Sequence, residues 1–183
     1  MTQIADRIRK LSDAFEAKVA AVPPEHWSSP SPCEGWDARD VVRHVVDVHG
    51  MMLKPAGREP SAGPSVDEDP LGAFRAARAD VEAVLDDPEL AGAEYDGVFG
   101  RTRVEATIDT FLGLDLVVHG WDLARAAGLD ETMDPGEVAR LAEQAKGLGD
   151  NLRRPGVCGP EVPAPPGANA QQRLLCLLGR DPR

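Results

Sequence analysis

The sequence has few aromatic residues and no long hydrophobic run. Aromatic residues make up 4% of its 183 residues, so its core must be built mainly from aliphatic side chains. No run approaches the roughly 18 apolar residues of a membrane-spanning helix, and the first residues lack the apolar centre of a secretory signal. We therefore expect a cytoplasmic protein that has no membrane partner.

Cysteine is also scarce. Cys33, Cys158 and Cys176 are odd in number and show no Cys-x-x-Cys spacing. This pattern argues against a disulfide framework and against a zinc site built from several thiolates.

Basic residues are outnumbered by acidic ones. The chain has 20 Lys and Arg against 31 Asp and Glu, which gives a net charge of −11. Nucleic-acid binders need a basic stripe and anionic membrane surfaces attract basic segments, so neither kind of partner is expected.

Apolar residues recur at helical spacing in five segments, which are separated by stretches rich in proline and glycine. In the first segment, Ile8, Leu11, Phe15 and Val19 follow one another at steps of three and four. The second segment is rich in valine, but it is longer than a typical strand and begins with a capping residue, Asp37. The expected helices cover residues 3–20, 38–53, 70–85, 102–127 and 134–148.

The connectors between these segments carry their own signals. The connector before residue 38 holds Trp27 and Trp36, and we expect these large side chains to hold it against the body. Residues 55–69 indicate an exposed loop, Tyr95–Gly97 a turn, and Thr102-x-x-Glu105 a capping box at the start of the fourth helix.

These patterns predict one all-α domain over residues 1–183, a helical bundle with extra short helices and proline-rich connectors. Residues 155–183 are expected to form a proline-rich tail whose short helix, near residues 174–178, packs on the bundle.

Asp115 and His119 are the clearest candidates for chemistry. They lie four residues apart, which places them on one face of a helix, and the residues between them are apolar. Two readings are open at this point. The two side chains are a buried hydrogen-bonded pair, or they are two metal ligands that another helix completes.

His44 is the candidate for a third ligand. It lies among the valines of the second helix, so it faces the interior of the bundle or its edge. His49 is turned from it by roughly 140° at about 100° per residue, and it suits a structural or exposed position near a helix end. His44, Asp115 and His119 would form a set with open coordination positions that Zn²⁺, Ni²⁺ or Fe²⁺ accepts. Alternatively, His44 is a core histidine that a backbone carbonyl satisfies.

Other polar residues flank these candidates. Asp47 and Asp122 each follow a candidate histidine by three residues and could orient its imidazole, or they are solvated. Arg125 is a candidate for binding an anionic substrate or for pairing with Asp122. We interpret Cys33 as a buried packing residue.

Three stretches of the chain resemble a known family. They look like the metal-binding domain of mycothiol-dependent maleylpyruvate isomerase and its uncharacterised actinobacterial relatives, within the DinB-like group. The stretches are residues 27–44 (WxxPSPCEGWDxRDVVxH), 115–128 (DLVVHGWDLARAxG) and 174–182 (LLxLLGRDP).

The resemblance implies a DinB-like four-helix bundle that binds a divalent metal through His44, Asp115 and His119. In the isomerase the acidic ligand is a glutamate, so the shorter Asp115 binds the metal directly or through a water. The isomerase also carries a separate C-terminal domain that contributes to its active site, so we do not expect its isomerase activity to transfer.

Two classes of function follow. The first is a metal-dependent transferase or isomerase-like enzyme, in which a thiol such as mycothiol attacks an electrophilic substrate and no side chain acts as general base. The second is a non-catalytic, metal-stabilised module for binding or sensing a small ligand. A bundle that binds no metal is the third alternative. For the assembly of the chain, a homodimer is the possibility we consider.

Overall fold

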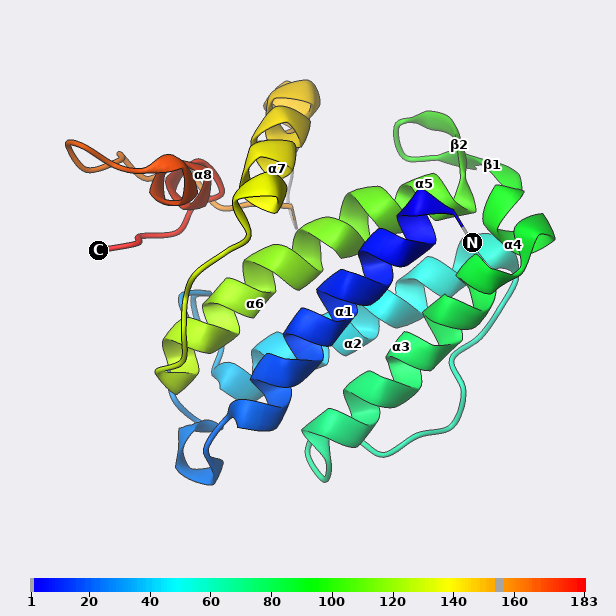
Figure 1. Ribbon diagram of the computed structural model, residues 1–183, viewed down its shortest axis with the longest axis horizontal. Coiled ribbons are helices and arrows are strands. Elements are labelled where there is room, and N and C mark those ends of the chain that lie inside the picture. The colour runs from blue at the N-terminus through cyan, green and yellow to red at the C-terminus, as the bar shows by residue number, and fades with distance from the viewer. Residues whose placement is uncertain (1, 154–156) are drawn as a thin grey trace. The chain divides into compact units, whose positions relative to one another are not determined.

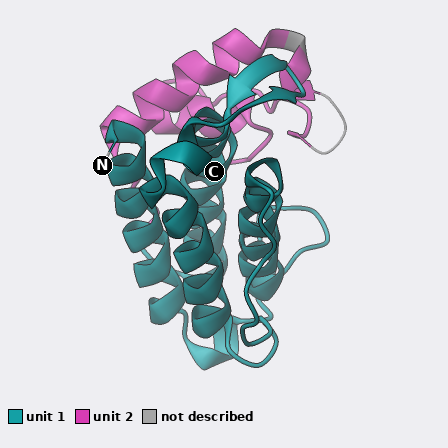
Figure 2. Cartoon of the chain, turned by 90° about the vertical axis from the view of Figure 1, so that its right-hand side faces the viewer, with its two compact units in different colours: residues 1–130 teal, residues 131–183 magenta. Residues whose placement is uncertain are grey.

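The computed structural model describes residues 2–153 and 157–183, which are mostly helical (Figure 1). The chain forms two compact units, residues 1–130 and residues 131–183 (Figure 2). The expectation of one domain with its tail packed on the bundle stays a prediction, and Pro155, at the start of that tail, lies outside the described residues.

Four long helices build the first unit. Helices α1 and α2 each pack against both α3 and α6, which closes a four-helix bundle (Figure 1). This arrangement confirms the predicted all-α fold class. The four helices are α1 (Gln3–Ala21), α2 (Ala38–Leu53), α3 (Pro70–Asp86) and α6 (Gly113–Ala127).

The ends of these helices follow capping chemistry. Asp37 accepts a hydrogen bond from the backbone N–H of Asp40, whose side chain accepts one from the N–H of Asp37, so the start of α2 is a full capping box. Gly128 ends α6 with a φ of 69°, a left-handed conformation that favours glycine. Both ends lie where the sequence predicts them. Short 3₁₀ turns, η1 (Pro24–His26) and η2 (Lys54–Ala56), lie between the first three helices.

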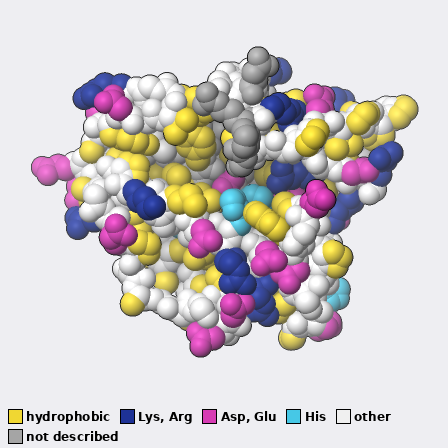
Figure 3. All heavy atoms as spheres, turned by 180° about the vertical axis from the view of Figure 1, so that it is seen from behind, with side chains coloured by type: hydrophobic (Ala, Val, Ile, Leu, Met, Phe, Trp, Pro, Cys, Tyr) yellow, Lys and Arg dark blue, Asp and Glu magenta, His cyan; other side chains and the backbone are white. Residues whose placement is uncertain are grey.

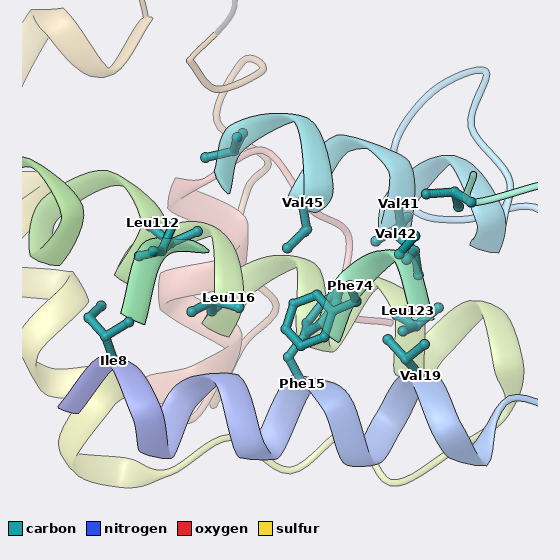
Figure 4. Close-up of a cluster of buried hydrophobic side chains, with 14 of the residues drawn as sticks. Ile8, Phe15, Val19, Val41, Val42, Val45, Phe74, Leu112, Leu116 and Leu123 are labelled. Carbon is teal, nitrogen blue, oxygen red and sulfur yellow. The ribbon is translucent and has the colours of Figure 1, made fainter. Parts of the chain in front are cut away.

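The core of the bundle is mainly aliphatic, as the composition predicts. Phe15 of α1 and Phe74 of α3 meet at its centre with their ring centroids 4.9 Å apart (Figure 4). The fully buried valines Val41, Val42 and Val45 point from α2 into the same cluster. The valine-rich segment is therefore helical because one of its faces fills the bundle, and this burial outweighs the strand preference of valine.

The region before α6 differs from the prediction. A short helix, α4 (Pro88–Gly92), leads into an antiparallel hairpin of β1 (Glu94–Gly97) and β2 (Gly100–Arg103), so the predicted turn at Tyr95–Gly97 is wrong. The predicted capping box at Thr102 is wrong as well. Thr102 pairs with Tyr95 across the hairpin, because strand pairing satisfies the backbone that a helix cap would otherwise serve.

The predicted long helix is interrupted. It begins as α5 (Val104–Thr107), passes through the π-helical segment η3 (Ile108–Leu112) and continues as α6. Ile108, Leu112 and Leu116 are all buried although they are spaced by steps of four, which drift by about 40° each around an α-helix. The wider π turn offsets this drift and keeps the three side chains on the core face.

The second unit contains α7 (Pro135–Leu148), the 3₁₀ turn η4 (Gly149–Arg153) and α8 (Ala170–Leu177). Asp134 caps α7, as predicted, by accepting the N–H of Glu137. The side chain of Gln171 on α8 accepts the N–H of Met133 and donates to the carbonyl of Glu131, so α8 holds the segment before α7.

Within the described ranges, no helix combines the length and the hydropathy that crossing a lipid bilayer requires.

Candidate metal centre

Helices α2 and α6 bring His44, Asp115 and His119 together. One potential ligand atom from each residue lies within 4.8 Å of the other two. His44 comes from α2, and the other two residues lie one turn apart on α6. Because α2 and α6 pack directly against each other, residues far apart in the sequence meet at one point.

The distances in this group suit a divalent ion. The two oxygens of Asp115 face different rings: Oδ2 lies 3.4 Å from Nε2 of His44, and Oδ1 lies 3.9 Å from Nε2 of His119. Two ligand atoms that are each about 2.1 Å from one ion lie about 3.4 Å apart at the tetrahedral angle. The first distance matches this value, and the second, to the other oxygen of Asp115, is longer. With one ligand atom of each residue within 4.8 Å of the other two, the group has the residue types and the approximate spacing of a metal site.

Asp122 fixes the ring of His119. Its Oδ2 lies 2.9 Å from Nδ1 of His119, and its side chain is completely buried. Because a carboxylate can only accept, Nδ1 carries the proton, and the lone pair of the neutral ring is on Nε2, which faces Asp115. A buried carboxylate that holds a histidine in this way is common behind metal ligands.

The centre is open on one side. The side chain of His44 is 33% exposed and that of Asp115 21%, whereas His119 is nearly buried. Histidine side chains reach the surface near the middle of the face shown in Figure 3. One carboxylate, two neutral imidazoles and a divalent ion sum to a charge of about +1, so such a site would attract an anionic ligand from solvent.

The connector before α2 forms a wall of the site. The Trp36 ring packs on both histidines, with its centroid 5.0 Å from that of His44 and 5.9 Å from that of His119. Cys33 reaches the same region, and its Sγ donates to Oδ2 of Asp122 at 3.4 Å.

The fold of this connector explains these positions. Pro30 and Asp37 form an isolated β-bridge, and the N–H of Trp36 donates to the carbonyl of Cys33. Gly35 has a φ of 78°, which lets the chain turn between the two residues. The prediction that the connector is held against the body is confirmed.

Sequence reasoning did not assign Trp36 and Cys33 to the site. The interpretation of Cys33 as a buried packing residue is wrong, because its side chain is half-buried and hydrogen-bonded to Asp122. The available signal was the tight Pro-Cys-Glu-Gly-Trp sequence immediately before a capped helix, which indicates a turn that folds back on that helix.

The remaining candidates lie in different surroundings. Asp47 is exposed and lines a surface groove beside Lys54 and Asp80. The guanidinium of Arg125 lies 4.9 Å from the centroid of the Trp121 ring, in a cation–π contact. Their roles as supporting or substrate-binding residues stay predictions.

His49 belongs to the core rather than to the metal group. It is 1% exposed, and its Nδ1 donates to the carbonyl of Val45 at 2.7 Å. Its ring packs edge-on against Phe74, so of the two predicted alternatives the structural one is confirmed. Burial lowers the pKa of His49 to about 4, because the charged ring would lose its hydration.

The chain is similar to known proteins over most of its length. The mycothiol maleylpyruvate isomerase N-terminal domain family matches residues 8–124. Two uncharacterised proteins of Mycobacterium tuberculosis, from strains CDC 1551 / Oshkosh and ATCC 25618 / H37Rv, are each 30% identical over 180 residues, which span 96% of this chain and 96% of the relative. No solved structure matches the chain.

Proposed function

The chain belongs to the mycothiol maleylpyruvate isomerase N-terminal domain family, and from this premise we propose that it is a divalent-metal-dependent enzyme that joins a low-molecular-weight thiol to an electrophilic substrate. Its all-α, DinB-like bundle is the fold of that family. Mycothiol is the thiol that the family suggests, and the activity proposed is that of a transferase or an isomerase-like enzyme.

One observation carries this proposal: two imidazoles and one carboxylate from two helices converge within 4.8 Å at an open position. His44, Asp115 and His119 would hold the metal, which we take to be zinc, nickel or iron. When bound, such an ion supplies a position where a thiol is held as thiolate near neutral pH. The charge of the three ligands and the ion favours an anionic sulfur over a neutral ligand.

The residues around the metal group would orient the reactants. By accepting from Nδ1 of His119, Asp122 favours the tautomer whose Nε2 lone pair is directed at Asp115. The Trp36 ring offers an apolar face beside the two histidines, on which the carbon part of a thiol or of its partner can lie.

The thiol gives its proton to solvent, and its sulfur forms a bond to the electrophilic carbon of the second substrate. In a transfer, the displaced group leaves with the bonding electron pair. In an isomerisation, the sulfur adds to one carbon of a conjugated double bond, and the π electron pair of that bond moves onto the electron-withdrawing group beside it. The resulting single bond rotates, and the electron pair then returns and expels the sulfur as thiolate.

Cobalt substitution tests the proposal. We expect the visible spectrum of the Co²⁺-loaded protein to shift when mycothiol or another small thiol is added, because the thiol enters the coordination sphere. The His44→Ala variant should lose the response to thiol, whereas His26→Ala is a control that keeps it. A Co²⁺ spectrum that no thiol changes would contradict the proposed activity.

A structural metal is the second candidate, because an ion held by His44 and His119 would cross-link α2 to α6. In that case the protein is a non-catalytic ligand-binding or sensing module. Chelation would then lower the melting temperature strongly and no thiol response would be seen. A labile metal, with a small change in melting temperature and a thiol response, favours the enzyme.

A further inference from the structure

A second group of potential ligands lies on the other side of the His119 ring. Cys33, His119 and Asp122 each offer one ligand atom, and these atoms lie within 4.8 Å of one another. Oδ2 of Asp122 is 3.4 Å from Sγ of Cys33 and 2.9 Å from Nδ1 of His119. Cys33 comes from the connector, and the other two residues from α6.

The chemistry of this group differs from that of the first. It offers a thiol sulfur, which soft cations such as Zn²⁺ and Cd²⁺ prefer, whereas the His44 group offers only nitrogen and oxygen. The surroundings differ too, because Asp122 is completely buried and Cys33 is half-buried.

Charge favours a divalent ion at this buried position. A thiolate and a carboxylate together carry a charge of about −2, so a divalent ion with these ligands and a neutral imidazole forms a neutral unit. Neutrality matters here because a buried group with an uncompensated charge is costly. The partly exposed group of His44, Asp115 and His119, here called the outer group, would keep a charge of about +1 by the same count.

We propose that Cys33, His119 and Asp122 form a second metal site, an inner site that binds thiophilic cations such as Zn²⁺ and Cd²⁺. On binding, the S–H proton of Cys33 goes to solvent and the sulfur takes up the ion as thiolate. No electron transfer or further reactant is involved.

The inner site is coupled to the first group through one ring. An ion on Nδ1 of His119 requires the proton of that nitrogen to move to Nε2, by way of solvent. Nε2 then no longer offers a lone pair to an ion beside Asp115 and His44. Filling the inner site therefore weakens metal binding at the outer group.

Cadmium titration tests the inner site directly. The full chain is reduced with a phosphine, since thiol reductants bind metals, and freed of metal with a chelator that is then removed. We expect one equivalent of Cd²⁺ to produce the ultraviolet charge-transfer absorption of a cadmium–thiolate bond. Cys33→Ser should abolish this absorption, and Asp122→Asn should weaken Cd²⁺ binding by about 10-fold or more.

Two matched controls make the result specific. Cys158 is half-buried like Cys33 but is not part of the proposed site. Cys158→Ser should therefore leave the absorption unchanged. His44→Ala removes a ligand of the outer group only, and it should likewise keep the absorption. A second measurement needs no variant: Cd²⁺ should protect Cys33, but not Cys158, from alkylation, which peptide mass spectrometry detects.

The proposal is overturned if the absorption persists in Cys33→Ser, if Cd²⁺ binds without a thiolate absorption, or if Cd²⁺ leaves Cys33 open to alkylation. Failure of the thiol-dependent activity gives a different result. In that case the Co²⁺ spectrum responds to no thiol, while the Cd²⁺ absorption of the inner site and its loss in Cys33→Ser are unchanged.

Discussion

Oδ2 of Asp122 lies 2.9 Å from Nδ1 of His119, one helical turn earlier on α6. This pair decides which nitrogen of His119 faces Asp115 and His44. The carboxylate is buried, the imidazole is nearly so, and a proton between them leaves the far nitrogen as the electron donor. The proposed metal group therefore depends on a residue outside it.

Removing a proposed ligand should remove the metal. We expect His44→Ala and His119→Ala each to lower the affinity for Ni²⁺ by at least about 100-fold, more than a supporting residue usually costs. Elemental analysis of the purified variants and competition with a coloured chelator measure this. His26→Ala controls for the loss of a histidine elsewhere in the first unit. Equal metal content in all four proteins would exclude the group.

Neutralising Asp122 should weaken metal binding by the outer group although it removes none of that group's ligands. Asp122→Asn keeps the size of the side chain but loses the charge that stabilises the His119 ring. We expect the Ni²⁺ affinity to fall by about 10-fold, measured by competition titration. Asp47→Asn serves as the matched control, because Asp47 is exposed. If both variants bind as tightly as the wild type, Asp122 does not orient the ring.

His49 should make the fold sensitive to acid. Its pKa is lowered from 6.5 to about 4, chiefly because the ring is buried. The hydrogen bond to Val45 and the charge of Asp115 raise this pKa, and the charge of Arg78 lowers it further. Between these two pH values His49 binds a proton in the unfolded chain but not in the folded chain. The contribution of His49 to the free energy of unfolding is therefore fully present above about pH 6.5. It decreases as the pH falls toward 4, and the total loss is about 3 kcal/mol.

Urea unfolding of the metal-free protein at pH 7 and pH 5 measures this effect. Metal is removed so that proton competition at His44 and His119 does not contribute. We expect the wild type to lose about 2 kcal/mol more between these two pH values than His49→Gln, which cannot titrate. The same pH dependence in both proteins would show that His49 is not responsible.

Two glycines of α6 should respond to alanine in opposite directions. A Cβ on Gly113 would lie 2.5 Å from Nη1 of Arg7, the atom that binds Asp109 at 2.7 Å. Gly113→Ala should displace this partly buried ion pair and destabilise the protein by about 1 kcal/mol net. A Cβ on Gly120 would meet Phe15 at an ordinary 3.6 Å, so Gly120→Ala should stabilise by about 0.5–1 kcal/mol.

Chemical denaturation of the metal-free variants gives both values. The double variant Arg7→Ala/Gly113→Ala should lose less stability than the sum of its single changes, because the alanine at 113 then has nothing to displace. A stabilising effect of Gly113→Ala would mean that Arg7 can move away without cost.

Local sequence patterns predicted the long helices of the bundle, but they did not predict the hairpin and the π turn that precede α6. The helices at residues 38–53 and 134–148 have caps and apolar faces that act within a few residues, and both occur as expected. Thr102 and Glu105 satisfy the same capping rule, yet Thr102 pairs with Tyr95 in a hairpin. The π turn at residues 108–112 could not be predicted from the spacing, because two steps of four drift by only about 80° in a regular helix and stay within the width of an ordinary apolar face.

The sequence by itself determined that Asp115 and His119 share a helix face, because that relationship depends only on helical periodicity. It also limited His44 to the core or its edge. Only the tertiary structure decided that the packing of α2 on α6 brings His44 to Asp115, that Asp122 is buried, and that the connector places Cys33 and Trp36 beside the rings. Those contacts depend on where separate segments meet, and no local spacing encodes that.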